Sequence, residues 1–229
     1  MLNDVMKNLE AARIAHEANR IAEAHRLGIT PEELDRRKAE AKRKADPDRA
    51  KWLARYDGIQ PRAVLEAVYD GKLEQTVGIR AVEHWLAAKD PAPCLVLLGG
   101  TGSGKTIAAL HAIRRLGAAR FVRAPELGGA VRPTSDERKL GQEELDPRRV
   151  GLLVIDDLGA EQLTPRFEQA LFLAIDARQD VSRRTIITSN LSKEDFRPRY
   201  DSRVVDRLNA IARVASLGGD SLRPKRAGL

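Results

Sequence analysis

The segment that most constrains the fold is a glycine-rich octet that follows directly after an apolar run. Residues 99–106 read GGTGSGKT and satisfy the G-x-x-x-x-G-K-[ST] pattern of a phosphate-binding loop. Residues 95–98 before them are all Leu or Val, and residues 107–113 after them can continue as a helix whose N-terminus faces the loop. A chance match in a glycine-rich loop lacks these flanks. The octet therefore predicts a strand–loop–helix unit of the P-loop kind.

The residue types of the octet suit the binding of nucleotide phosphates. Its glycines let successive backbone N–H groups turn toward the β-phosphate, and Lys105 supplies a positive charge to the β- and γ-phosphates. The hydroxyl of Thr106 can ligate Mg²⁺. We therefore expect ATP and Mg²⁺ as cofactors. The expected nucleotide-binding residues are Gly100, Thr101, Gly102, Ser103, Gly104, Lys105 and Thr106.

Strands and helices are expected to alternate through the rest of this region. Strands are predicted near residues 120–123, 151–155 and 185–188, with a helix over residues 165–179. Such alternation is typical of βαβ units around a parallel sheet, where a nucleotide binds at the carboxyl ends of the strands. Two short helices are expected before the first strand, over residues 61–70 and 76–88.

Two carboxylates follow the apolar run at residues 152–155, as in a Walker B element. In the usual division of labour Asp156 would position Mg²⁺ and Asp157 would polarise the attacking water. Asp is shorter than the Glu common at the second position, so Asp157 needs a closer approach or an intervening water. Glu161 is a reserve candidate. The alternative is that both carboxylates are acidic capping residues of a strand-to-helix turn.

Further polar residues come later in the chain. Asn190 follows the strand at 185–188 and could orient the attacking water, although asparagine is also common in turns. Arg203 and Arg207 lie one helical turn apart, and an arginine on such a helix can reach the phosphate of a neighbouring subunit. The alternative is a surface pair bound to Asp201 or Asp206.

The first 57 residues differ in composition from the rest of the chain. They are rich in Ala, Glu, Lys and Arg, and apolar residues such as Ile14 and Ile21 recur at helical spacing. Thr30 and Glu33 form a capping box for a second helix, which Asp46-Pro47 either ends or restarts. Such a narrow apolar face buries little, so we expect a helical arm (residues 1–57) that binds a partner, ahead of an ATPase domain (58–229). The alternative is a solvated arm without a specific partner.

Charge and cysteine content narrow the remaining possibilities. A formal net charge of +7 favours a polyanionic partner. The single cysteine, Cys94, excludes an internal disulfide and is expected in the core. No apolar run reaches the roughly 18 residues of a membrane span, and the N-terminus lacks a signal-peptide pattern, so a cytoplasmic protein without membrane contact is expected. Candidate DNA contacts are Arg123, Arg132 and Lys139, while residues 125–149 match no motif.

Together these motifs resemble, in their order, the DnaC/IstB group of AAA+ ATPases. The resemblance covers about residues 58–223 and rests on residues 99–106, 155–159, 177–178, 186–191 and 203–208 and on Gly219-x-Ser221-x-Arg223. It implies a P-loop AAA+ parallel sheet flanked by helices, preceded here by a small all-helical arm. It also implies roles for four residues. Asn190 takes the sensor 1 role, Arg207 is the trans-acting arginine finger with Arg203 beside it, and Arg223 resembles the terminal sensor arginine.

Three functions are consistent with this resemblance. The first is a helicase loader whose arm binds a replicative hexameric DNA helicase and delivers it to single-stranded DNA, with ATP bound between self-associated subunits. The second is a transposition helper that shares every site residue and binds duplex DNA and a transposase. The third is a non-hydrolysing ATP-dependent adaptor in which Asp157 is too short to act.

Overall fold

The protein is described by a computed structural model that covers residues 2–89, 91–117, 119–130, 148, 150–179 and 183–218; in the first helix, side chains are described for Glu10 and from Arg13 onward. The chain divides into two compact units, Met1–Leu65 and Glu66–Leu229. Arg132, Lys139 and Arg223, named above as candidates, lie outside the described residues. Of the unassigned segment 125–149, only residues 125–130 and 148 are described.

The N-terminal unit is helical. It contains α1 (Leu2–Arg26), α2 (Pro31–Lys44), α3 (Pro47–Arg55) and the first half of α4 (Arg62–Tyr69). The Thr30 hydroxyl accepts a hydrogen bond from the N–H of Glu33 at 3.2 Å and caps α2, as the capping box predicts. Asp46 caps α3, so the Asp46-Pro47 pair restarts the helix rather than ending it.

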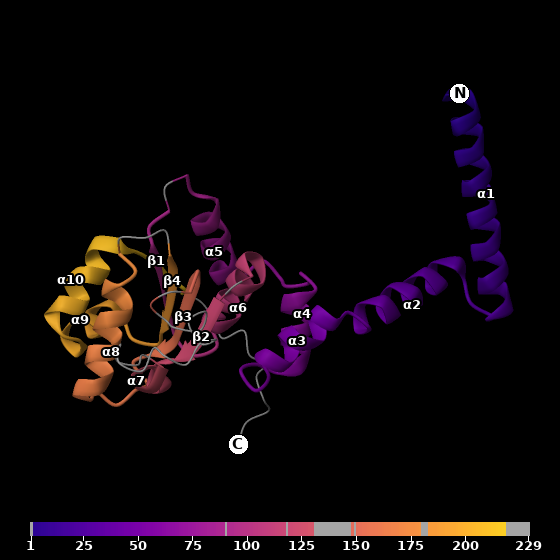
Figure 1. Cartoon of the computed structure of the whole chain (residues 1–229). Coiled ribbons are helices and arrows are strands. Elements are labelled where there is room, and N and C mark those ends of the chain that lie inside the picture. The colour runs from indigo at the N-terminus through magenta and orange to yellow at the C-terminus, as the bar shows by residue number, and fades with distance from the viewer. Residues whose placement is uncertain are drawn as a thin grey trace, which may run out of the picture. The chain divides into compact units, whose positions relative to one another are not determined.

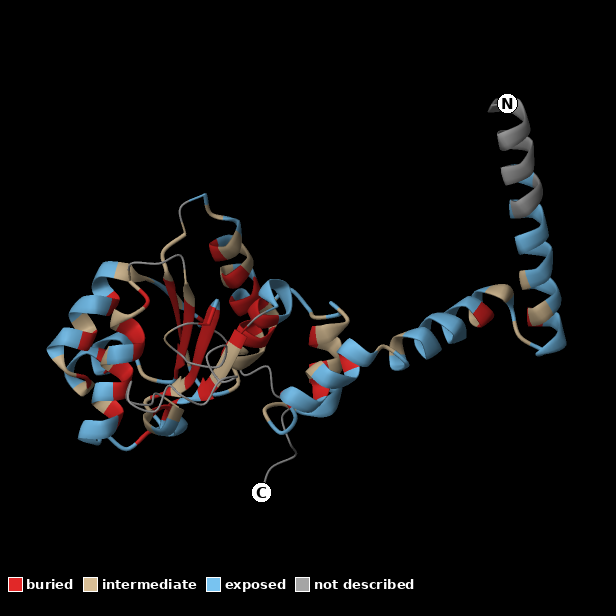
Figure 2. Cartoon of the chain, in the orientation of Figure 1, coloured by how far each residue is buried: buried red, intermediate tan, exposed pale blue. Residues whose placement is uncertain are grey.

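Little of this unit is buried (Figure 2). Ion pairs join α1 to α2 through Arg20–Asp35 and Lys38–Glu23. Ile14 and Ile21 on α1 remain 62% and 51% exposed. Within the described residues of α1, these two apolar side chains are not covered by another element.

The C-terminal unit is built on a five-stranded parallel sheet with the strand order β2-β3-β4-β1-β5. The strands are β1 (Cys94–Leu98), β2 (Ala119–Arg123), β3 (Leu152–Leu158), β4 (Arg184–Ser189) and β5 (Ala212–Ser216). β1, β3 and β4 are interior strands buried on both faces, which explains the apolar runs of β1 and of the first four residues of β3, whereas β4 also buries polar residues such as Thr185 and Thr188. The predicted α/β class is confirmed.

Helices cover both faces of the sheet (Figure 1). On one face lie α5 (Val77–Ala87) and α6 (Lys105–Leu116), joined by a 2.6 Å contact between Glu83 Oε1 and His111 Nε2. The helices on the other face are α8 (Pro165–Asp176), α9 (Lys193–Arg199) and α10 (Ser202–Ile211). Between β2 and β3 lie the short helices η1 (Ala124–Glu126) and α7 (Leu127–Ala130).

The structure adds four elements to those expected and changes the bounds of others. η1, α7, α9 and β5 had no counterpart in the sequence prediction, β3 continues past the two carboxylates to Leu158, and α8 ends at Asp176 rather than at residue 179. Cys94 is fully buried, as expected, and burial raises the pKa of its thiol to about 12. No helix among the described residues is long and apolar enough to cross a membrane.

Candidate nucleotide site

The strand order brings the predicted site residues to one edge of the sheet. β4 lies between β1 and β3. Asn190, which follows β4, therefore comes between the glycine-rich loop after β1 and the carboxylates Asp156 and Asp157 at the end of β3. The carboxyl ends of parallel strands are where α/β sheets bind ligands, and this crossover between β1 and β3 is the place where a nucleotide is expected.

The start of the loop is tightly packed. A Cβ atom on Gly99 would come within 2.6 Å of the carbonyl oxygen of Leu217, which follows β5. The N–H of Leu217 in turn donates to the carbonyl oxygen of Leu98 at 2.7 Å. Only glycine fits at residue 99, and the segment after β5 closes against the loop.

The ammonium group of Lys105 joins the loop to the strand beside it. It donates to the carbonyl oxygens of Gly99 and Gly100 at 2.7 and 2.9 Å and to Asn190 Oδ1 at 2.8 Å. The residue is only 5% exposed. A lysine ammonium at this position of the loop suits the phosphates that the loop sequence predicts.

A second set of hydrogen bonds surrounds Asp156. The Thr106 hydroxyl lies 3.0 Å from Asp156 Oδ1, and the Thr188 hydroxyl donates to the same oxygen at 2.6 Å. Burial raises the pKa of Asp156 and the neighbouring charge of Asp157 raises it further, while the hydrogen bonds from Thr188 and Thr106 oppose these effects. The folded protein therefore favours the protonated form of Asp156 more than water does.

Asp157 lies beside Asp156 in an unusual backbone conformation. Its φ is 56°, and it alone among the described non-glycine residues has a positive φ. Its N–H donates to the Thr188 hydroxyl at 2.9 Å, and Asn190 Nδ2 lies 3.3 Å from its Oδ1. Thr188 therefore contacts both the carboxylate of Asp156 and the backbone of Asp157, a role that the sequence analysis missed because a threonine within a strand carries no signal of its own.

The residues present fit an ATP–Mg²⁺ complex. The hydroxyl of Thr106 and the carboxylate of Asp156 supply the oxygen ligands that Mg²⁺ prefers, next to a loop that suits phosphates. Among the described residues there is no group of three or more His, Cys, Asp or Glu side chains that could hold a metal ion. Mg²⁺ in nucleotide sites is usually bound by one or two protein ligands and by the substrate phosphates.

Arg203 and Arg207 are not part of this set of contacts in the part of the chain that is described. Arg203 forms an ion pair with Asp201 at 3.1 Å, one of the two partners considered for it. Arg207 pairs with Asp176 of α8 at 3.2 Å and not with Asp206. Both side chains lie on α10 and are exposed despite these ion pairs, so another molecule can reach them.

Glu161, the reserve candidate, is already engaged. Its side chain is 1% exposed and accepts hydrogen bonds from the N–H of Gly159, from Arg199 and from the Tyr200 hydroxyl. A carboxylate with these partners is not free to act on a water molecule. The structure therefore gives Glu161 a different role from the one suggested by the sequence.

Arg123, which the sequence indicates as a candidate DNA contact, lies near the nucleotide site. Arg123 ends β2 in register with Asp156, and its charge lowers the pKa of Asp156, so it belongs to the nucleotide edge of the sheet.

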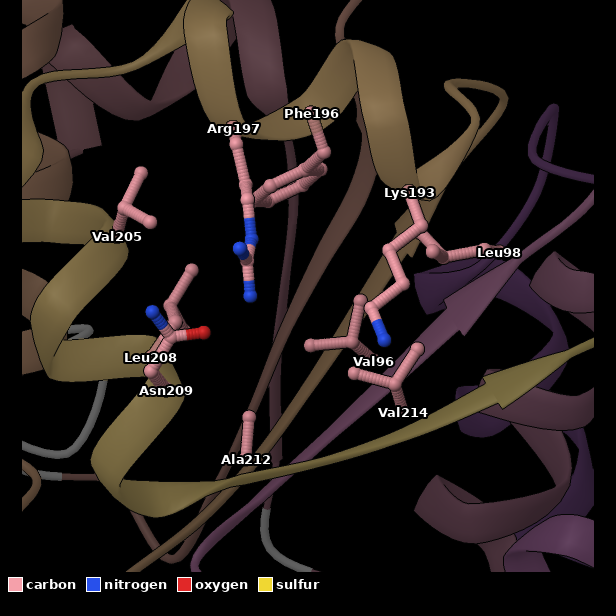
Figure 3. A pocket seen from close by; sticks show the side chains of 10 residues that line it. All are labelled: Val96, Leu98, Lys193, Phe196, Arg197, Val205, Leu208, Asn209, Ala212 and Val214. Carbon is pink, nitrogen blue, oxygen red and sulfur yellow. The ribbon is translucent and has the colours of Figure 1, made fainter.

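A separate groove of about 160 Å³ lies between α9, α10 and the strands β1 and β5. The side chains of Lys193 and Arg197 extend from α9 toward these strands (Figure 3). This groove is not at the glycine-rich loop.

The sheet order, the loop between β1 and α6, and the paired carboxylates together define an AAA+ P-loop ATPase. The chain belongs to the family of IstB-like ATP binding proteins, whose sequence profile matches residues 34–228. Among curated proteins, a sequence search found no significant match.

Solved structures show the same fold. The crystal structure of the DnaC helicase loader aligns with a TM-score of 0.54 and 22% identity, covering 68% of this chain and 99% of that chain. The crystal structure of DnaI gives 0.54 and 21%, covering 69% and 95%. AMPPCP-bound DnaA from Aquifex aeolicus gives 0.55 and 16%, covering 72% and 53%. These likenesses establish the AAA+ fold of the C-terminal unit.

Proposed function

We propose that this protein is an ATP-dependent helicase loader. Its helical arm would bind a replicative DNA helicase, and its AAA+ unit would assemble through shared ATP sites and contact single-stranded DNA. The observation that carries the proposal of a loader is the fold shared with the DnaC helicase loader, of which this chain covers 99%. The hydrogen-bonded set of Lys105, Thr106, Asp156, Asp157 and Asn190 supports its ATP-dependent part.

Within one subunit we assign each residue of this set a role. Lys105 and the loop N–H groups would hold the phosphates, while Thr106 and Asp156 would hold Mg²⁺, which supplies charge neutralisation on the phosphate oxygens when bound. Asp157 would accept the proton of the attacking water, directly or through a second water, and Asn190 would orient that water. The contact from Asn190 Nδ2 to Asp157 supports this pairing.

The other half of the site would come from a neighbouring subunit. Arg207 is exposed on α10, has the planar donor geometry suited to phosphate, and pairs with Asp176 of α8 rather than with a residue of the loop. We assign it as the trans-acting arginine, with Arg203 beside it. Arg223 keeps its sequence-based assignment as a terminal sensor residue.

The Arg207→Ala variant tests this assignment. Removing a trans-acting arginine is expected to lower kcat by at least about 100-fold, while the Kd for ATP changes by less than about threefold. ATP hydrolysis is measured against protein concentration, with and without single-stranded DNA. Arg115→Ala serves as a control, because Arg115 is also an exposed, ion-paired helical arginine (3.5 Å from Glu83).

Mixing variants shows whether the arginine acts between subunits. Lys105→Ala subunits lack the phosphate lysine but keep Arg207, so an equal mixture with Arg207→Ala subunits is expected to regain activity that neither has alone. Undiminished activity of Arg207→Ala by itself would contradict the assignment.

The family match favours one second candidate, a transposition helper that binds duplex DNA and a transposase. The two candidates differ in their DNA preference. A loader is expected to show stronger ATPase stimulation by single-stranded DNA, and a transposition helper by duplex DNA. ATP binding without turnover under any DNA condition would instead favour the non-hydrolysing adaptor.

A further inference from the structure

The buried carboxylate of Glu161 links two segments that are far apart in the sequence. Its Oε2 accepts the N–H of Gly159 at 2.7 Å. Its Oε1 accepts the Tyr200 hydroxyl at 2.9 Å and Arg199 Nη2 at 3.1 Å. Arg199 Nη2 also donates to the carbonyl oxygen of Glu161 at 2.9 Å. Each carboxylate oxygen therefore serves a different segment.

One of these segments carries Asp157. Gly159 follows it by two residues and has a φ of 112°, and a Cβ atom there would lie 2.9 Å from Leu191. The turn from Asp157 to Gly159 is therefore confined to a conformation that few residues can adopt. The hydrogen bond to Glu161 fixes the end of this turn, and the turn sets the direction of the Asp157 side chain.

The other segment leads into α10. Arg199 ends α9, Tyr200 follows it, and Asp201 caps α10 by accepting the N–H of Arg203 at 2.8 Å. The Tyr200 ring also packs on Phe196 with 5.0 Å between the ring centroids. Glu161 thus holds the residue immediately before the cap of the helix that bears Arg203 and Arg207.

We propose that Glu161, with Arg199 and Tyr200, is a positioning cluster that keeps the Asp157 turn and α10 in a fixed relation. One buried group, Glu161, then fixes the positions of two parts of the site. These are Asp157, which acts on the subunit's own nucleotide, and the arginines Arg203 and Arg207, which act on the neighbouring subunit. Both segments share hydrogen bonds with one buried carboxylate, so a displacement of either segment strains the bonds to the other. The part that concerns the neighbour rests on the proposed function of Arg207.

The Tyr200→Phe variant removes one hydroxyl and keeps the ring packing. It is expected to lower kcat about 5- to 20-fold, the loss of one buried hydrogen bond to a charged group, with KM for ATP within about twofold. Tyr56→Phe is the matched control, because Tyr56 is a buried tyrosine of the N-terminal unit. Equal kcat for Tyr200→Phe and wild type would contradict the proposal. A purely structural role would lower the melting temperature without a selective loss of kcat.

Subunit mixing isolates the effect on the neighbour. Lys105→Ala subunits cannot use their own site, so in a roughly tenfold excess over wild type they supply most of the arginines that the wild-type sites receive. Adding Tyr200→Phe to the Lys105→Ala subunits is expected to lower the rate per wild-type subunit at least about threefold further. Identical rates for the single and double variants would overturn the link to α10.

Amide hydrogen exchange separates this proposal from the proposed function. A non-hydrolysable ATP analogue is expected to slow exchange in both the loop of residues 99–106 and α10 in the wild type, and in the loop alone in Glu161→Gln. A wild type whose loop responds while α10 does not would overturn the cluster. The protein could also show the expected exchange pattern and yet hydrolyse no ATP under any condition. That result would refute the proposed function and support the cluster.

Discussion

At the scale of single residues, Asp156 shows a conflict between stability and ligand binding. It is 3% exposed and lies next to a second carboxylate, and both circumstances raise its pKa. A carboxyl group whose pKa is raised in the folded state favours folding when protonated. It disfavours folding as the pH rises through that pKa and the charged form must be buried. The site therefore keeps a charge that the fold alone does not favour.

Asp156→Asn is expected to stabilise the protein and to abolish Mg²⁺-dependent hydrolysis. Asparagine keeps an acceptor for Thr188 and removes the buried charge, so the melting temperature without nucleotide should rise by roughly 2–4 °C at pH 7, or about 1 kcal/mol. The difference from wild type should shrink as the pH is lowered, because the wild-type carboxyl becomes protonated. Calorimetry over a pH series measures both effects.

The control for this measurement is Asp57→Asn, a change at an exposed position of the N-terminal unit. A lower melting temperature for Asp156→Asn than for the wild type would show that the carboxylate stabilises the fold and would contradict the expectation.

At the scale of elements, the sequence predicts those strands whose apolar runs are bounded by turns. β1 and β3 are such strands, because burial on both faces favours continuous apolar runs. β4 has a shorter run, Ile186-Ile187, between two buried threonines. β5 is an edge strand that leaves Val214 45% exposed, so its sequence has no such run. α9 is short, highly charged and contains Pro198, which masks the helical pattern.

The site was predictable to the same extent as its elements. The residues at 99–106, Asp156, Asp157 and Asn190 follow predicted strands, and parallel strands bring their ends together. Thr188 and Glu161, in contrast, form hydrogen bonds with residues of neighbouring strands and helices. Their partners depend on strand register and helix placement, which local sequence does not encode.

Arg178 is a second contact between elements that local sequence does not reveal, and it joins the starts of β3 and β4. Its fully buried guanidinium donates to the carbonyl oxygen of Val150 at 2.7 Å, to that of Gly151 at 3.3 Å and to the Thr185 hydroxyl at 2.8 Å. Burial lowers its pKa to about 10, so it remains charged at neutral pH. It lies at the amino ends of these strands, at the edge opposite the nucleotide site.

Arg178→Lys is expected to destabilise the protein by about 2–4 kcal/mol, because an ammonium group cannot reach these acceptors together. The Kd for ATP should change by less than about threefold, since the change is remote from the loop. Urea unfolding and nucleotide titration measure the two quantities. Arg166→Lys, which loses one exposed hydrogen bond to Gly128 O at 2.9 Å, is the control. Unaltered stability of Arg178→Lys would contradict this account.

At the scale of the whole molecule, the chain combines a unit with a conventional core and a unit with little buried surface. The sheet unit buries strands and helices, whereas α1 leaves Ile14 and Ile21 exposed seven residues apart on its surface. Two apolar residues at this spacing lie on the same helix face. We propose that this face is where the arm binds its partner.

The double variant Ile14→Glu/Ile21→Glu tests the arm in the full-length chain. Both side chains are exposed, so the melting temperature should change by less than about 2 °C, while the affinity for a replicative helicase should fall at least about tenfold. Leu173→Glu, at a position 38% exposed in the sheet unit, is the control. Helicase binding that survives the double variant, measured by ultracentrifugation, would exclude this face.

The position of β4 between β1 and β3 has a chemical consequence for Asn190. Its carbonyl oxygen faces the ammonium of Lys105, and its amide nitrogen faces the carboxylate of Asp157. The amide dipole therefore lies between the cation of Lys105 and the anion of Asp157. Each end of the amide faces the charge that it attracts. Deamidation, which exchanges the amide nitrogen for oxygen, would turn this complementary contact into a repulsive one. Complementary charge on both sides thus requires a neutral amide at residue 190.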